Sequence, residues 1–209
     1  MAMDDLQRTQ GWFLDRLGYA TASKFKAILA KGKGGAPSAT RKSYIAQLVC
    51  DILTGKPGES FCNAAMQRGT DLEPFAKMAY EERTGIIVQE VGFIKHATLR
   101  AGASPDGLAD EGMIEIKCPD QSTHQETLLC GMDSGHMPQV QGQMWITGRP
   151  WNDFVSYDDR FPPEMQLYIQ RIFRDEAYIK NLEVEVTKFL LEVDQAVIQL
   201  KEKYHGITQ

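Results

Sequence analysis

The sequence has few of the residues that build a zinc site or a disulfide framework. Its four cysteines form no CxxC pair, and its four histidines are scattered along 209 residues, so the clusters that hold structural zinc are missing. A chain of this length buries a sufficient core without disulfides. We therefore expect no zinc chemistry, and we expect the thiols to be reduced and mostly buried.

Long apolar runs and targeting signals are also lacking. No stretch approaches the roughly 20 apolar residues that span a membrane, and the first ten residues, MAMDDLQRTQ, lack the pattern of a secretory signal. There is no internal repeat. The composition, 43% hydrophobic and 24% charged, is typical of a folded globular protein. These absences predict a cytoplasmic protein without membrane contact.

Acidic residues are absent from one segment. The whole chain carries 23 Lys and Arg against 28 Asp and Glu, and this net charge of −5 is unusual for a nucleic-acid-binding protein. Residues 16–50 contain seven basic residues and no acidic one, so the other residues together carry −12. Such segregation can draw a polyanion to one surface. A solvated lysine-rich loop explains the charges as well, and charge alone slightly favours that alternative.

The order of predicted elements indicates an α/β (α+β) fold in one domain. Apolar periodicity and capping residues predict helices over 21–30 (capped by Thr21 or Ser23), 41–53, 70–84, 138–147 and 163–204. Alternating patterns predict strands over 86–91, 93–96, 108–110, 113–118 and 153–157. We expect a central mixed sheet flanked by helices, with a helical C-terminal region. The parts are N-terminal helices with a basic loop (1–85), a catalytic sheet with a glutamine-bearing helix (86–157) and C-terminal helices (158–209).

Two apolar helix faces are expected to be buried. In the helix predicted to begin at Thr70, a capping box of Thr70 and Glu73 would start the helix, with Pro74 in its first turn. Its core-facing residues are predicted to be Phe75, Met78 and Ala79. In the last helix the predicted core stripe is Phe189, Leu190, Val193, Val197, Leu200 and Tyr204.

The sharpest local pattern is Ser-Pro-Asp-Gly at 104–107 followed by Glu-Ile-Lys at 115–117. The turn places Asp106 at the start of a strand, and alternation puts Glu115 and Lys117 on one face of the next strand. A hairpin across 109–112 would bring the two carboxylates together, where a hard cation such as Mg²⁺ relieves their repulsion. These groups suit phosphodiester hydrolysis. An ordinary turn and a surface strand explain the same residues equally well.

Motifs elsewhere in the chain favour a site for phosphodiester hydrolysis over an ordinary turn and surface strand. In order they are RLGYATAS at 16–23, Arg-Gly with Glu73 at 68–73, SPDGL at 104–108, EIKCP at 115–119 and PQVQGQMW at 138–145. Together they resemble the phage lambda-type exonucleases, the YqaJ-like viral recombinase family, whose core belongs to the restriction-endonuclease-like PD-(D/E)xK superfamily. The similarity extends from about residue 12 to residue 157.

The resemblance implies a magnesium site, with Mn²⁺ as a substitute. Asp106, Glu115 and the backbone carbonyl of Ile116 would be the ligands, and Lys117 would position or activate the attacking water. Glu73 would hold a second metal or a metal-bound water, unless it serves only in the capping box. Gln139 would contact water or the scissile phosphate; the alternative is a plain helix N-terminus.

The resemblance also implies residues that bind DNA. Arg16, Ser23 and Ser104 map onto a pocket for a 5′-terminal phosphate; the alternatives are helix capping by Ser23 and a surface ion pair of Arg16 with Asp15 or another acid. Lys33, in the basic loop, would contact the DNA backbone or groove. Met66 would part the terminal base pairs, although a core contact is the favoured interpretation.

The function implied is a Mg²⁺-dependent, processive 5′-to-3′ exonuclease acting on linear double-stranded DNA with a 5′-phosphorylated end. By this resemblance the enzyme would be a ring-shaped homotrimer in the bacterial host cytoplasm, and a phage single-strand annealing protein would take its 3′ overhangs. One alternative is an endonuclease on the same core. Another is a catalytically silent DNA-binding scaffold for recombination.

Overall fold

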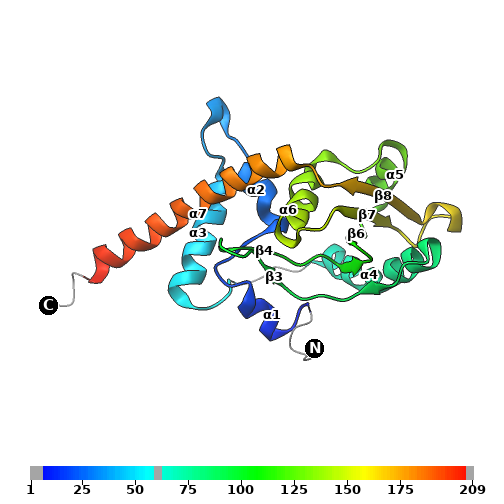
Figure 1. Ribbon diagram of the computed structural model, residues 1–209, viewed down its shortest axis with the longest axis horizontal. Helices are drawn as coiled ribbons and strands as arrows, with labels where there is room; N and C mark the ends of the chain where they lie inside the picture. The colour runs from blue at the N-terminus through cyan, green and yellow to red at the C-terminus, as the bar shows by residue number, and fades with distance from the viewer. Residues whose placement is uncertain (1–6, 59–62, 206–209) are drawn as a thin grey trace.

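The computed structural model describes residues 7–58 and 63–205 (Figure 1). The first half contains α1 (Gln10–Asp15), β1 (Ala20–Thr21), η2 (Ala22–Lys24), α2 (Phe25–Leu29), η3 (Lys33–Gly35), α3 (Ala39–Thr54), α4 (Ala64–Thr84), β2 (Val88–Gln89), β3 (Ile94–Lys95) and β4 (Ala101–Ala103). The second half contains β5 (Gly107–Ala109), β6 (Gly112–Lys117), α5 (Gln121–Cys130), η4 (Ser134–His136), α6 (Met137–Thr147), β7 (Trp151–Tyr157), η5 (Pro163–Met165), β8 (Leu167–Phe173) and α7 (Glu176–His205).

A five-stranded mixed sheet with the order β2-β5-β6-β7-β8 is the centre of the molecule. The β6–β7 pair is parallel, and the other pairs are antiparallel. A smaller sheet, β1-β4-β3, joins the N-terminal segment to the rest of the fold. The prediction of a mixed sheet flanked by helices is confirmed.

Helices cover both faces of the five-stranded sheet. The side chains of β6 point alternately to the two faces, as predicted, and each set packs against a different helix. Ile114 and Ile116 lie in one apolar cluster with Leu72 and Tyr80 of α4. Residues 113, 115 and 117 lie on the other face, where Met113 packs with residues of α6. A separate core joins α2, α3 and α7 (Figure 1).

The start of α4 differs from the prediction. The helix begins at Ala64, with the side chain of Asn63 accepting from the backbone N–H of Met66. Thr70 is therefore inside the helix, and its hydroxyl donates to the carbonyl of Met66. The capping box of Thr70 and Glu73 is wrong, and Pro74 lies well inside the helix instead of in its first turn.

The buried face of α4 was predicted wrongly for Phe75 and Met78, whereas Ala79 packs against the apolar cluster on the sheet as predicted. Leu72, Ala76 and Tyr80 are buried, whereas Phe75 is 56% exposed and Met78 is 63% exposed. The buried residues follow a spacing of four, which is one helical face. Tertiary packing on the sheet selects this face, although the next one is also apolar.

The C-terminal region contains a strand that the prediction of continuous helix missed. Leu167–Phe173 forms β8, which pairs with all seven residues of β7. Its sequence, LYIQRIF, is rich in aromatic and β-branched residues, which favour a pleated surface once a neighbouring strand is present. The helical prediction is therefore wrong over these residues, and α7 begins only at Glu176.

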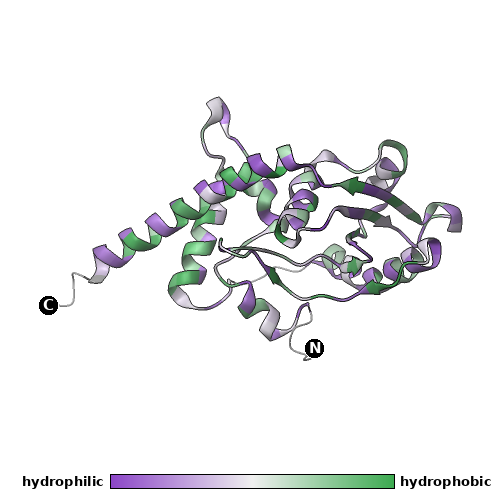
Figure 2. Ribbon diagram, in the orientation of Figure 1, coloured by the Kyte–Doolittle hydropathy of each residue, from purple (hydrophilic) through white to green (hydrophobic). Residues whose placement is uncertain are grey.

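The apolar stripe of α7 is buried along part of its length. Phe189, Val193 and Val197 are buried, but Leu200 is 38% exposed and Tyr204 is 59% exposed. The far end of α7 projects beyond the body of the molecule (Figure 1), and apolar residues continue along it (Figure 2). The predicted core role of the last two residues is wrong for this reason.

Smaller corrections concern caps and thiols. Neither Thr21 nor Ser23 makes the predicted side-chain capping bond. Cys50 and Cys130 are exposed free thiols and Cys118 is a half-buried one, so the expectation of mostly buried thiols is wrong; Cys62 lies outside the described residues. Within the described ranges, every helix is too short or too polar to cross a bilayer.

Candidate active site

The β5–β6 hairpin fixes Asp106. Its backbone N–H donates to the carbonyl of Ile114 at 3.1 Å, and its Oδ2 accepts from the N–H of Ile116 at 2.7 Å. Asp110 turns the chain between the strands with a positive φ of 48°. The predicted hairpin is thus present, and it holds the carboxylate against the strand that carries the rest of the motif.

Glu115, Lys117 and Gln139 converge on that hairpin. Glu115 is 2% exposed, and its Oε1 accepts from Lys117 Nζ at 2.5 Å and from Gln139 Nε2 at 2.6 Å. Lys117 Nζ also donates to Gln139 Oε1 at 3.3 Å. The side chains come from β6 and from the first turn of α6, so three of the predicted residues form one bonded group.

Gln143 belongs to the same group, although the sequence analysis did not select it. Its Nε2 donates to Glu115 Oε2 at 2.5 Å. The signal was present in the sequence: Gln139 and Gln143 are four residues apart, which puts both on one face of α6.

Glu73 approaches from α4 and is bound by Arg8, a second residue that the sequence analysis missed. Arg8 donates to Glu73 Oε2 at 2.5 Å. The chain before α1 is anchored by Gln7, whose side chain donates to the carbonyls of Val91 and Pro105. Arg8 has a positive φ of 68°, an uncommon conformation for a residue other than glycine.

One cavity of about 160 Å³ connects the two predicted groups of residues. It is lined by Asp106, Glu115 and Gln139 of the predicted metal site, and by Arg16, Ser23 and Ser104 of the predicted phosphate pocket. These residues come from segments up to 123 positions apart, and the fold places them around a single space.

Two larger cavities are lined by other residues of the predicted metal site. One, of about 470 Å³, is lined by Glu73, Asp106 and Ile116 among others. The other, of about 710 Å³, is lined by Glu73, Ile116 and Lys117, together with Met66. Arg8 lines all three cavities. The predicted metal site is therefore accessible from several sides.

Arg16 and Ser104 are held by Trp12. Its indole Nε1 donates to Ser104 Oγ at 2.9 Å, and the Arg16 guanidinium lies 3.9 Å from the centre of its ring. Asp15 pairs with Lys95, so the alternative partner that we considered for Arg16 is engaged elsewhere. Burial lowers the pKa of Arg16. An anion beside this cation would compensate for the lost solvation.

The carboxylates repel one another. Burial raises the pKa of Asp106 well above its usual value, and the charges of Glu115 and Glu73 raise it further. Burial lowers the pKa of Lys117, but Glu115, Asp106 and Glu73 outweigh that effect, and the net shift is upward. A further cation would be stabilised at such a site.

The donor set fits Mg²⁺ bound largely through water. Among the described residues, no three His, Cys, Asp or Glu side chains come close enough together to bind a metal by themselves. Mg²⁺ keeps several water ligands and commonly uses one or two carboxylates. Asp106, Glu115 and the carbonyl of Ile116 meet that requirement without further protein ligands.

The remaining predicted residues lie farther out. Met66 is 54% exposed, so the favoured prediction of a core contact is wrong. Lys33 is exposed on the loop that projects at the top of Figure 1, and it lines none of the three cavities. Within the basic segment, Arg41 is buried and paired with Glu192, whereas the lysines are exposed.

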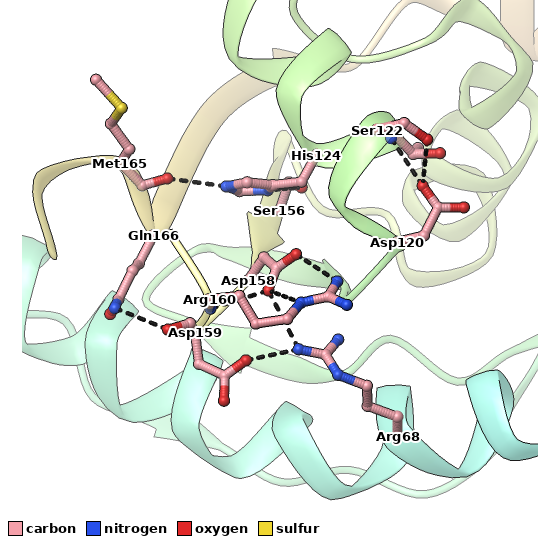
Figure 3. A network of polar contacts seen from close by, with 11 residues as sticks. Arg68, Asp120, Ser122, His124, Ser156, Asp158, Asp159, Arg160, Met165 and Gln166 are labelled. Atoms are coloured by element: carbon pink, nitrogen blue, oxygen red, sulfur yellow. Dashed lines mark hydrogen bonds and ion pairs between the residues drawn. The ribbon is translucent and has the colours of Figure 1, made fainter. Parts of the chain in front are cut away.

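An ion-pair network joins α4 to the end of β7 (Figure 3). Arg68 and Arg160 of this network also line the cavity of about 710 Å³. Arg68 donates to Asp158 at 3.1 Å and to Asp159 at 2.6 Å, and Arg160 binds Asp158 through two nitrogens. Asp158 is fully buried. Burial alone would raise the pKa of Asp158, but Arg160 and Arg68 outweigh it and lower the pKa to about 2.

We expect Asp158→Asn to destabilise the protein in a pH-dependent way. A carboxyl with a pKa of about 2 in the folded state and about 4 in the unfolded state contributes about 2 kcal/mol above pH 4, and loses this contribution as the pH falls toward 2. Urea unfolding of both proteins between pH 7 and pH 3 measures the difference. The exposed neighbour is the control: Asp159→Asn should cost less than about 1 kcal/mol. Equal losses in the free energy of unfolding for the two variants would contradict a stabilising role of the buried Asp158 carboxylate.

Comparisons with known proteins identify a matching family model and similar solved structures. A model of the YqaJ-like viral recombinase domain matches residues 11–150. LHK-Exo, described as an alkaline exonuclease from Laribacter hongkongensis, is 47% identical, with a TM-score of 0.89 over 96% of this chain and 100% of that one. A second LHK-Exo structure, in complex with dAMP, is 48% identical, with the same coverage and TM-score.

Two further similarities are weaker. A phage-related exonuclease from Haemophilus somnus 129PT is 18% identical, with a TM-score of 0.71 over 87% of this chain and 96% of that one, and it supports the fold alone. The protein ExoD of Escherichia coli (strain K12) is 33% identical over 67 residues, which are 32% of this chain and 76% of ExoD.

Proposed function

The chain belongs to the YqaJ-like viral recombinase family, and on this premise we propose that it is a Mg²⁺-dependent exonuclease that digests one strand of linear double-stranded DNA from a 5′-phosphorylated end. The observation that carries the proposal is the shared cavity, in which two carboxylates lie next to an arginine and two serines. Lys117 is hydrogen-bonded to Glu115, one of these carboxylates. The alkaline exonuclease activity named for a relative with nearly half its residues identical supports it.

The metal site would be formed by Asp106, Glu115 and the carbonyl of Ile116, with Mn²⁺ as a substitute for Mg²⁺. The bound cation would stabilise the charge that develops on the phosphate and lower the pKa of a water ligand. The Lys117 ammonium would position the attacking water and stabilise the same charge. Gln139 would fix the orientation of Lys117 through their hydrogen bond. Glu73 would hold a further water or metal ion from the α4 side.

The direction of digestion would follow from the phosphate pocket. Arg16, Ser104 and Ser23 would bind the terminal dianion, because a guanidinium and hydroxyls are suitable donors for phosphate. The phosphodiester one nucleotide away would then lie at Asp106 and Glu115, since both groups line one cavity. Met66, which is exposed at the next cavity, would part the terminal base pairs.

Assembly and partners form a further part of the proposal. A ring-shaped homotrimer would enclose the DNA and make digestion processive 5′ to 3′, with Lys33 and the other exposed lysines facing the phosphates. The 3′ overhang would pass to a phage single-strand annealing protein in the host cytoplasm. The segregation of positive charge into residues 16–50 of an acidic chain supports a DNA-facing surface.

A strand-specific assay tests the proposal. Linear duplex DNA with 5′ phosphates, each strand labelled separately, is incubated with Mg²⁺, and closed-circular DNA is included. We expect loss of label from the 5′ end of each strand and intact circles. Cleavage of circles would establish the endonuclease alternative instead. No Mg²⁺-dependent cleavage of either substrate, with DNA binding retained, would establish the silent scaffold.

Arg16→Ala tests the phosphate pocket. Loss of charge-assisted hydrogen bonds worth about 1.5–3 kcal/mol should reduce the preference for phosphorylated over hydroxyl 5′ ends by about 10- to 100-fold. The ratio of initial rates on the two substrates measures it. Arg100→Ala is the control, because Arg100 pairs with Asp194 and lines none of the three cavities. An unchanged ratio in Arg16→Ala would reject the pocket.

A further inference from the structure

Three polar side chains form a buried row behind the predicted metal site. Gln143 Nε2 donates to Glu115 Oε2 at 2.5 Å, and Asn152 Nδ2 donates to Gln143 Oε1 at 2.7 Å. Gln143 is 1% exposed and Asn152 is fully buried. The row joins α6 to β6 and β7 and ends in the protein interior.

The direction of these hydrogen bonds is fixed by chemistry. A carboxylate only accepts, so Gln143 must turn its amide nitrogen toward Glu115. The amide oxygen of Gln143 then faces Asn152, which must present its own nitrogen. Glu115 therefore determines the orientation of both amides, and both amides in turn hold Glu115 Oε2.

The inner end of the row contains a buried polar atom that lacks a hydrogen bond. Asn152 Oδ1 is buried without a hydrogen-bond partner, and it is the one such side-chain atom found in the described part of the chain. A buried acceptor without a hydrogen-bond partner destabilises the folded state. Turning both amides around would not remove the cost, because it would leave a buried donor unpaired and bring two oxygens together at Glu115.

We propose that Gln143 and Asn152 are positioning residues that hold Glu115 Oε2 toward the interior, so that Oε1 is presented to the cation. This inference rests on the proposed function, since it presumes that Glu115 binds Mg²⁺. Oε1 lies on the accessible side, where its partners Lys117 and Gln139 are half-buried. Outer hydrogen bonds of this kind orient a ligand before the metal arrives.

Metal binding without DNA is the decisive measurement. Free Mn²⁺ is followed by electron paramagnetic resonance as it is titrated into each protein. Gln143→Met, which keeps the side-chain length and removes the donor, should weaken Mn²⁺ binding by about 10- to 100-fold. Gln141→Met is the matched control: Gln141 is a buried glutamine on the same helix, bonded to Phe173 and Asp175. The Mn²⁺ affinity of Gln141→Met should stay within about twofold of that of the parent protein. Thermal unfolding verifies that each variant is folded.

A double-mutant cycle separates positioning from general destabilisation. Asn152→Leu should weaken Mn²⁺ binding severalfold in the parent and by less than about twofold in Gln143→Met, because Asn152 acts through Gln143. Parent-like affinity in Gln143→Met, an equal loss in Gln141→Met, or a full effect of Asn152→Leu in both backgrounds would overturn the inference. No Mn²⁺ binding by the parent would overturn the cation site as well, whereas unaffected variants of a metal-binding parent would overturn only the positioning role.

Discussion

Lys117→Ala should abolish DNA hydrolysis, with a loss of at least about 10³-fold, while the fold and DNA binding are retained. Removing one preorganised charge-stabilising donor from an active site typically costs about 10²–10³ in rate, and Lys117 would both stabilise charge and position water. The fold should survive because the Lys117 side chain is 31% exposed and Glu115 keeps its bonds to Gln139 and Gln143.

Single-turnover hydrolysis of 5′-phosphorylated duplex, with binding measured separately in Ca²⁺, tests this prediction. Lys117→Met removes the ammonium and keeps the aliphatic chain, so it should be as inactive as Lys117→Ala. Lys188→Ala removes a surface lysine paired with Glu185 on α7 and should keep full activity. Turnover by Lys117→Ala within tenfold of the parent would remove Lys117 from the mechanism.

The β5–β6 hairpin could be predicted from the sequence because its determinants are local. Asp106 lies in a Pro-Gly turn, and Glu115 and Lys117 are two residues apart on one strand, so backbone geometry alone places them together. The fold class follows from similarly local patterns. Arg16 and Ser104 are 88 positions apart, and only the resemblance to a family connected them before the structure did.

The remaining features depend on contacts between distant segments. Arg8 reaches Glu73 across 65 positions, and Asn152 reaches Glu115 only through Gln143, so neither pairing leaves a local pattern. β8 is a strand because β7 provides seven partners for it. Phe75 and Met78 of α4 were misassigned to the core because two adjacent faces of that helix are apolar and only the sheet selects between them.

The attachment of α4 to the sheet leads to the second large expected effect, which is on stability. Asp153 of β7 accepts from the buried hydroxyl of Tyr80 on α4 at 2.8 Å, and from two nitrogens of Arg171 at 2.8 Å. Burial and Asp153 together raise the pKa of Tyr80, so the phenol stays a donor. Asp153→Ala leaves that donor buried without an acceptor and releases Arg171, so we expect a loss of about 3 kcal/mol in the free energy of unfolding.

Urea unfolding at pH 7 measures this loss, and an exposed pair of the same type provides the control. Asp194→Ala removes the partner of Arg100, but Asp194 is half-exposed, so the expected loss is below about 1 kcal/mol. Tyr80→Phe removes both the hydroxyl and the need for an acceptor, and should cost only about 1 kcal/mol. If Asp153→Ala were no more costly than Tyr80→Phe, Asp153 would not be what holds α4 to β7. Glu73 lies on α4 and Asn152 lies on β7. The hydrogen bond between Tyr80 and Asp153 therefore also fixes the relative position of the two elements that flank the proposed metal site.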